Sequence, residues 1–235
     1  MMKKIIGQAS RANHQDSEHW MNVSDLMAGL MMVFLFISIA LMRSAIIERN
    51  KIKDVAIAYQ GNQVAIYESL MAEFKDDLTK WDAEIDKDSL AFRFKSPDIL
   101  FGTGKSKLTD SFQLILSDFF PRFLSTLEQF NDVVEEIRIE GHTSSDWEGL
   151  SKENAYFHNM NLSQRRTNSV LKYIHDIEVN KQRRDWIRMN VAAVGYSSSR
   201  LILTADGLED SRSSRRVDFR VVTNAETQIR KILVE

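Results

Sequence analysis

The chain of 235 residues contains no cysteine, only two prolines and only nine glycines. The absence of cysteine excludes disulfide frameworks, thiolate zinc sites and cysteine nucleophiles. The formal net charge of -2 argues against a basic surface that would hold nucleic acid. Hydrophobic residues make up 43% of the chain and charged residues 27%, which excludes a disordered or collagen-like chain and predicts one or two domains. The mean hydropathy of -0.29, taken alone, is typical of a soluble protein.

One long apolar run near the N-terminus does not fit that average. Residues 26–42 carry no charge, and the run extends back to Met21 with Asp25 as its one charged residue. A helix over this run spans about 33 Å, enough to cross the hydrocarbon core of a bilayer. Trp20 lies where an interfacial anchor is expected. We therefore predict a transmembrane helix over residues 20–46, rather than a cleaved signal peptide or a buried core helix, because the run is long, apolar on every face and lacks a cleavage site behind it.

The ends of the chain are polar, and they leave the orientation of this helix open. Residues 1–19 predict a short flexible tail, and residues 224–235 a C-terminal tail. Basic residues both precede and follow the apolar run, so the positive-inside rule gives no clear orientation.

Asp25 lies five positions, roughly 7.5 Å along a helix, beyond Trp20. A carboxylate at that depth is costly unless it is neutral, hydrated or paired. Because an apolar environment favours the protonated form, such a group can exchange a proton near neutral pH, which is the chemistry of an ion relay. The alternative is that Ser24 or Asp25 begins the helix as a cap, where the helix dipole favours a negative charge. The spacing alone leaves both interpretations open.

Residues 47–87 predict a linker helix. The stretch 43–87 holds seven basic and nine acidic residues, so the excess acid of the chain lies there. Apolar residues recur at alternating spacings of four and three, namely Tyr67, Met71, Phe74, Leu78, Trp81 and Ile85. This spacing is typical of a coiled-coil seam and predicts a homodimer. The alternative is an amphipathic helix packed on the domain that follows.

The remaining residues, 88–223, predict one α/β domain. Alternating or apolar stretches predict strands at 90–94, 137–141, 191–195 and 217–222, and helical periodicity predicts helices at 111–130 and 162–179. Pro121 either kinks the first of these helices or starts a second one. The order β-α-β-α-β-β predicts helices on one face of a mixed sheet.

Several short patterns look catalytic but lack the context that the chemistry needs. Gly102–Ser106 resembles the end of a phosphate-binding loop, but Ile99 stands where its first glycine is required. Ser169 and Lys172 match the S-x-x-K spacing in the middle of a predicted helix, without the partner motifs. The histidines show no ligand spacing, and the basic stretch 181–188 is typical of a solvated loop. We therefore expect no enzyme activity, no cofactor and no metal.

Four segments of the last domain together resemble the OmpA-like peptidoglycan-binding domain. The segments are Leu100-Phe101-Gly102-Thr103-Gly104, Ile139-Glu140-Gly141-His142-Thr143, Asn159-x-x-Leu162-Ser163-x-x-Arg166 and Arg212-x-x-Arg215-Arg216-Val217-Asp218. The resemblance implies that the domain binds the stem peptide of peptidoglycan, especially its diaminopimelate group. The residues that it implicates are Thr143, Ser144, Asp146, Asn159, Leu162, Arg166 and Arg216.

Within this set, the resemblance gives Arg166 the role of holding a ligand carboxylate, for which a guanidinium fork is well suited. The chain departs from the family at Ser144, which stands where an aspartate is expected to hold the ligand ammonium. Asp146 could substitute for that aspartate, or the hydroxyl of Ser144 could hold the amine. Affinity or ligand choice is therefore expected to differ from the rest of the family.

A membrane helix with an acid near its start, followed by such a domain, resembles the MotB family of stator subunits. In that family the matching aspartate binds the translocated ion, which assigns this role to Asp25. The string Ser24–Phe36 and the segment Gly141-His142-Thr143-Ser144-Ser145 are most similar to the ZorB family, the MotB-like subunits of Zorya anti-phage defence systems. A flagellar MotB subunit and a passive tether between membrane and cell wall are the alternatives.

This resemblance implies a proton-driven rotary motor in the bacterial inner membrane. Two copies of the chain would sit inside a ring of five copies of a multi-pass partner that resembles ZorA or MotA. The N-terminus would be cytoplasmic and the C-terminal domain periplasmic, held on peptidoglycan. The sequence leaves open whether the ion is a proton or sodium, and how rotation is coupled to defence.

Overall fold

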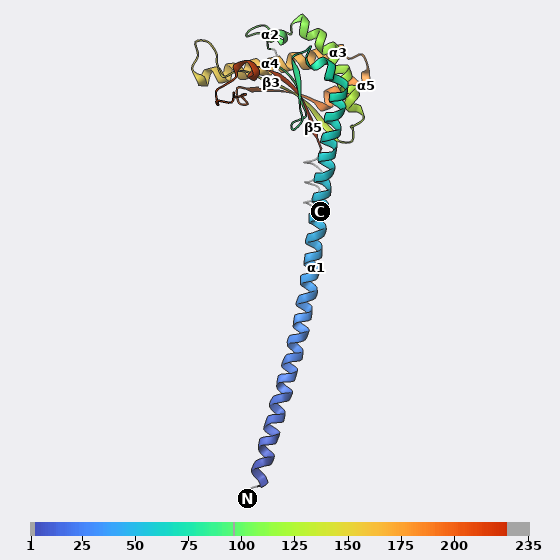
Figure 1. Ribbon diagram of the computed structural model, residues 1–235, viewed down its shortest axis with the longest axis vertical. Helices are drawn as coiled ribbons and strands as arrows, with labels where there is room; N and C mark the ends of the chain where they lie inside the picture. Colours follow the sequence, from blue (N-terminus) through green and yellow to red (C-terminus); the bar gives the residue numbers. More distant parts are fainter. Residues whose placement is uncertain (1–2, 96, 225–235) are drawn as a thin grey trace. The chain divides into compact units, whose positions relative to one another are not determined.

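The computed structural model describes residues 3–95 and 97–224 (Figure 1). Contacts divide the chain into two compact units, one ending at Asp54 and the other beginning at Val55. The helix α1, Lys3–Leu78, contributes to both units. The C-terminal tail expected at 224–235 lies, apart from Asn224, outside the described residues.

In the first unit, α1 exposes every side chain from Val23 to Lys51. An 18-residue window of this stretch has a mean hydropathy of 2.4 and no buried residue, so the helix is long and apolar enough to cross a membrane. The flexible tail expected at residues 1–19 is wrong for its described part, because the helix already begins at Lys3. No proline interrupts this stretch, so the helical hydrogen bonding continues into the apolar run.

The second unit is a mixed sheet with helices. Its elements after α1 are β1 (Ala83–Asp86), β2 (Ala91–Phe94), α2 (Pro97–Leu100), α3 (Asp110–Glu128), β3 (Val134–His142), α4 (Lys152–Ile177), α5 (Lys181–Asn190), β4 (Val191–Ser197), α6 (Ser211–Ser214) and β5 (Val217–Thr223). The strand order is β1-β2-β5-β3-β4. The strands β3 and β4 pair in parallel, and the other neighbouring strands pair antiparallel. The predicted mixed α/β fold is thereby confirmed.

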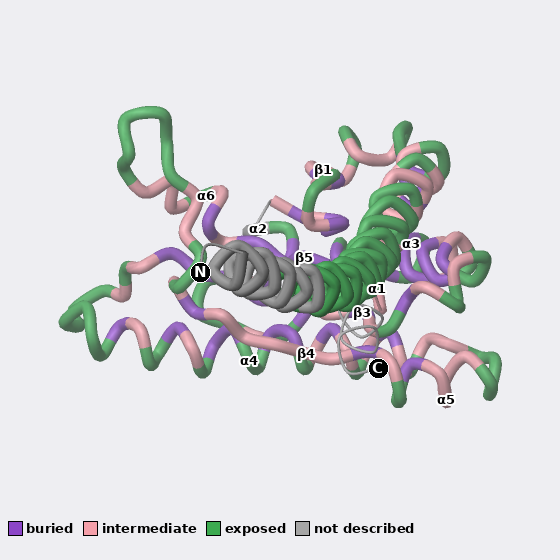
Figure 2. Tube along the Cα trace, turned by 90° about the horizontal axis from the view of Figure 1, so that it is seen from below, coloured by how far each residue is buried: buried purple, intermediate pink, exposed green. Residues whose placement is uncertain are grey.

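Alternation along the strands separates an apolar face from a charged one. On β2 and β5, Phe92 and Phe219 are fully buried, whereas the neighbouring Arg93 and Asp218 form an ion pair on the opposite face. Helix α3 covers the apolar face, since Phe119 lies 4.5 Å from Phe92 and 5.1 Å from Phe219 between ring centroids. Figure 2 shows buried and exposed positions alternating along α4.

The predicted coiled-coil seam packs instead on the chain's own domain. Of the predicted seam, Phe74 is fully buried, with its ring 5.3 Å from the Phe92 ring, and Tyr67, Met71, Leu78 and Trp81 are partly buried against the same core. Ile66 and Leu70 of α1, which the predicted seam did not include, are also fully buried. Helix α1 ends at Leu78, and the last seam residues fall on a turn and on strand β1. The linker helix expected to reach residue 87 is therefore too long, and the alternative of a helix packed on the following domain is the one that the structure has. The physical reason is that the apolar face of the sheet must be buried, and the apolar side of α1 buries part of it within the same chain.

Two predicted helices also differ from the structure. Helix α3 continues past Pro121, so of the two alternatives left open there, the start of a second helix is wrong. Helix α4 begins at Lys152, ten positions before the expected start at Leu162. Ser151 caps it by accepting a hydrogen bond from the Asn154 amide, and the polar first turns hide the helical periodicity from the sequence.

Candidate functional site

A pocket of about 290 Å³ lies where the end of β3 meets the N-terminal half of α4. The loop after α2 and the residue that follows α6 close its other sides. Its lining consists of Phe101, Thr103, Gly104, Thr143, Ser144, Asp146, Trp147, Glu148, Asn159, Leu162, Arg166 and Arg215.

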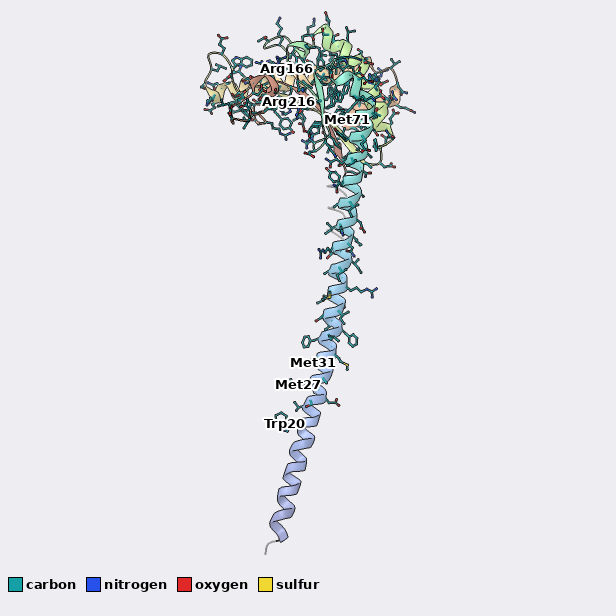
Figure 3. All side chains as sticks on the ribbon, viewed as in Figure 1. Trp20, Met27, Met31, Met71, Arg166 and Arg216 are labelled. Atoms are coloured by element: carbon teal, nitrogen blue, oxygen red, sulfur yellow. The ribbon has the colours of Figure 1, made fainter. Side chains whose placement is uncertain are left out.

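Six of the seven residues that the resemblance implicates line this pocket, and Arg216 does not. The Arg216 side chain is 5% exposed, and its Nε lies 3.2 Å from the Asp218 carboxylate. Its neighbour Arg215 lines the pocket instead, because successive residues at the start of an extended segment point to opposite sides. Arg216 therefore lies outside the lining of this pocket, contrary to the expectation from the resemblance. Figure 3 labels it in the same domain as Arg166.

Helix α4 presents Asn159, Leu162 and Arg166 on one face, since spacings of three and four bring side chains together on a helix. The Asn159 amide donates hydrogen bonds to the backbone oxygens of Ser144, at 3.0 Å, and Asp146, at 3.4 Å. One helix residue thus holds the loop that forms the opposite wall.

Two glycines let α4 lie this close to the sheet. A Cβ at Gly195 would lie 2.5 Å from the Gln164 amide nitrogen, and one at Gly141 would lie 2.7 Å from a methyl group of Thr167. Any larger residue at either position would push the helix away from the strands and open the pocket wall.

Arg166 is a nearly buried cation without an anionic partner. Its residue is 8% exposed, its Nε donates to the backbone oxygen of Lys105 at 3.0 Å, and its guanidinium lies 4.9 Å from the Phe101 ring centroid. Within residues 3–95 and 97–224 it forms no ion pair. Burial, and then the charge of Arg215, lower the pKa of Arg166 to about 10, so it stays protonated at neutral pH. A buried charge of this kind calls for an anionic ligand.

The acidic groups of the pocket are exposed, whereas the buried part of its wall is uncharged or positive. Thr143 and Ser144 are 3% and 7% exposed, and the Thr143 hydroxyl is buried without a hydrogen-bond partner. Asp146 and Glu148 also line the pocket but are exposed. At position 144, where the resemblance leads us to expect an aspartate, the serine supplies no carboxylate. Asp146, two residues further along, lines the same pocket and does carry one.

Glu209 is a residue that the sequence reasoning missed. Its carboxylate accepts a hydrogen bond from the Ser145 amide at 2.9 Å and another from the Ser145 hydroxyl. It belongs to a small hairpin closed by the bridge between Leu203 and Glu209. No motif in the sequence marks it, since the contact joins positions 64 residues apart.

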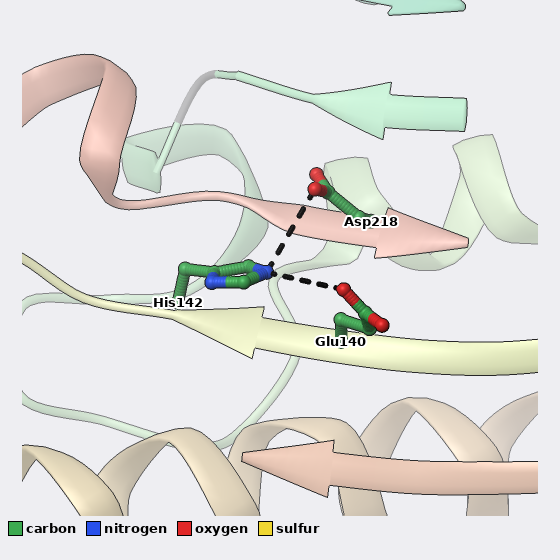
Figure 4. Close-up of side chains that lie close together, drawn as sticks. All are labelled: Glu140, His142 and Asp218. Atoms are coloured by element: carbon green, nitrogen blue, oxygen red, sulfur yellow. Dashed lines mark ion pairs between the residues drawn. The ribbon is translucent and has the colours of Figure 1, made fainter. Parts of the chain in front are cut away.

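A cluster of buried charged side chains lies on the face of the sheet opposite Phe219. His142 Nε2 lies 3.7 Å from carboxylate oxygens of both Glu140 and Asp218 (Figure 4). These are metal-ligand types, but arginines already pair with both carboxylates: Arg216 with Asp218, and Arg200 with Glu140, each at 3.2 Å. Their positive charges disfavour a further cation, so we interpret the cluster as an internal ion network.

Asp25 lies well inside α1, with its side chain exposed. The interpretation of Ser24 or Asp25 as a helix cap is therefore wrong, because the helix begins at Lys3. Trp20, Met27 and Met31 project from the same stretch of helix (Figure 3).

The second unit matches the model of the OmpA family over residues 100–216. Among solved structures, a MotB-like protein from Desulfovibrio vulgaris aligns with 74% of this chain and 94% of its own length, at 18% identity and a TM-score of 0.48. The cell wall anchor of the type VI secretion system (T6SS) from Pseudomonas aeruginosa aligns with 66% of this chain and 96% of its own, at 21% identity and a TM-score of 0.45.

A full-length relative matches far more strongly. The Zorya protein ZorB of Escherichia coli is 55% identical over 235 residues, which cover 100% of both chains. An identity of this size over the whole length includes the apolar helix as well as the sheet domain. The chain therefore belongs to the ZorB family.

Proposed function

We propose that the domain binds the peptide stem of peptidoglycan in this pocket and anchors a bacterial inner-membrane complex to the cell wall. The observation that carries the proposal is the buried guanidinium of Arg166, which has no carboxylate partner among the described residues. A guanidinium presents a planar fork that matches a carboxylate. The carboxylate of diaminopimelate supplies the missing negative charge.

The rest of the pocket suits the remainder of such a ligand. The exposed carboxylates of Asp146 and Glu148 stand where a ligand ammonium can reach them from solvent. The unpartnered Thr143 hydroxyl and the Ser144 hydroxyl offer neutral hydrogen bonds beside Arg166. The site therefore binds a zwitterionic group with its carboxylate inside and its amine near the opening.

Replacing Arg166 by alanine tests this anchoring function. Loss of a charged hydrogen-bonding partner is expected to weaken co-sedimentation of the full chain with isolated peptidoglycan by at least about tenfold. Arg165→Ala is the matched control, because Arg165 is the exposed neighbour on α4 and lies outside the pocket. Unchanged sedimentation of Arg166→Ala would contradict the site.

We infer that the anchored complex is a proton-driven motor of a Zorya-type defence system. In it, α1 crosses the inner membrane once with its N-terminus in the cytoplasm, and two copies sit inside a ring of a ZorA- or MotA-like partner. Asp25 takes up and releases the proton. Two observations support this role of Asp25: it is the one carboxylate at the start of the apolar run, and the chain belongs to the ZorB family. One charge that crosses the membrane supplies about 2.3 kcal/mol per 100 mV.

The chain acts in this proposal as a structural subunit and not as an enzyme, in keeping with its family and its OmpA domain. The pocket needs no reacting group for this role. Its charges bind peptidoglycan and keep the subunit stationary, so that the ring of the ZorA- or MotA-like partner can rotate around it.

A further inference from the structure

A second arginine, Arg215, faces the same pocket as Arg166. It lines the pocket from the segment between α6 and β5, and its Nε is buried without a hydrogen-bond partner. Both guanidinium-bearing side chains line this one pocket, and the charge of Arg215 helps to lower the pKa of Arg166. No ion pair to either arginine is present in the part of the chain that the structure describes.

This pairing is unusual within the domain. The other arginines with largely buried side chains, Arg93 and Arg216, both pair with the carboxylate of Asp218 at 3.2 Å. Like charges beside a shared cavity repel one another more strongly than in water, because the surrounding protein screens them less. One ligand carboxylate neutralises only one of the two guanidinium groups.

We propose that Arg215 and Arg166 together form a twin-guanidinium subsite for a ligand that presents two carboxylate groups. The inference rests on the proposed peptidoglycan function. It narrows the ligand to stem peptides in which the two carboxyl groups that meet Arg166 and Arg215 are both free. A peptide in which one of them is converted to an amide leaves one guanidinium uncompensated and binds more weakly.

The fold holds Arg215 in place before any ligand arrives. Asp210 caps α6 by accepting hydrogen bonds from the amides of Arg212 and Ser213, both at 3.1 Å. The Ser214 hydroxyl accepts a hydrogen bond from the Ile202 amide at 2.9 Å. The residue before Arg215 is thus tied to the neighbouring hairpin, so that little ordering is required on binding.

Titration calorimetry of the full chain in detergent micelles tests the subsite with two probes. One probe is a soluble diaminopimelate stem peptide with its carboxyl groups free, and the other is the same peptide amidated at one diaminopimelate carboxyl. The natural chain is expected to bind the free acid about tenfold more tightly than the amide, the size of one charged hydrogen-bonding contact. Arg215→Ala is expected to bind both peptides with equal, weakened affinity.

Arg212→Ala is the matched control, since this exposed arginine lies three residues earlier and outside the pocket, and it should keep the tenfold preference. A second readout does not depend on the stability of a variant: the Nε–H resonance of Arg215 should shift on addition of the free acid and much less with the amide. A preference retained by Arg215→Ala, or a resonance that does not move, overturns the proposal. If the natural chain binds neither peptide nor isolated peptidoglycan, the proposed function itself fails.

Discussion

At the scale of single residues, His142 couples the stability of the domain to pH. Burial disfavours the charged imidazole and lowers the pKa of His142 below 6.5; the Glu140 carboxylate opposes this shift and the Arg216 charge reinforces it. Asp218 also faces the ring, the Tyr196 ring stacks on it at 5.3 Å, and three further arginines, Arg93, Arg200 and Arg220, pair with the two carboxylates. The buried ring is thus surrounded by charged groups, and a proton on the ring would add a further positive charge among them.

The free energy of unfolding should therefore fall as the pH drops below about 6.5. In that range the unfolded chain takes up a proton that the folded chain still excludes, and the loss continues down to the lower folded pKa. His142→Gln should flatten this dependence in urea unfolding of the full chain between pH 5 and 7.5, followed by near-ultraviolet circular dichroism. His175→Gln, at a more exposed ring, is the control. If the free energy of unfolding of His142→Gln depends on pH as steeply as that of the natural chain, His142 is not the cause of the pH dependence.

At the scale of elements, the end of α1 is fastened to α3 by one arginine. The Arg122 guanidinium contacts carboxylates of Glu73 at 2.7 Å, Asp77 at 3.0 Å and Asp118 at 3.2 Å. It also lies 4.8 Å from the Phe74 ring centroid. These contacts fix the helix that emerges from the first unit onto the helical layer of the domain.

Removing the ion pairs of Arg122 should weaken the packing of the C-terminal end of α1 on α3 without unfolding the domain. Arg122→Ala is expected to lower the free energy of unfolding by about 1–2 kcal/mol, as a network of partly exposed ion pairs with a cation–π contact supports. Hydrogen exchange should become faster in residues 66–78. Arg188→Ala, which loses only an exposed contact with Asp185, serves as the control. Equal exchange in both variants would show that apolar packing alone holds the helix.

At the scale of the whole molecule, the proposed motor depends on a membrane acid that the wall-binding domain does not need. Asp25→Asn keeps the shape of the side chain but cannot exchange a proton at physiological pH. The variant should still dimerise and sediment with peptidoglycan, while protection against phage in a plaque assay of the complete defence system should be lost. Full protection by this variant would favour the passive tether.

Much of this molecule could be predicted from local patterns. The uncharged run at 26–42 indicates a membrane helix because each residue carries its own transfer free energy, whatever its neighbours are. Alternation in 217–222 predicts β5, and the spacing of Asn159, Leu162 and Arg166 places them on one helix face. These are properties of a few consecutive residues, so the sequence by itself determined them.

Two local patterns each allowed two different contacts, and only the tertiary structure decided between them. The apolar side of α1 fits a second helix or a sheet equally well, and in the folded chain it packs on the apolar sheet face around Phe92. The adjacent Arg215 and Arg216 are alike in sequence, but Asp218 pairs with one and leaves the other to the pocket. Burial and ion pairing are free energies between residues far apart in the chain, and the folded arrangement alone brings those residues together.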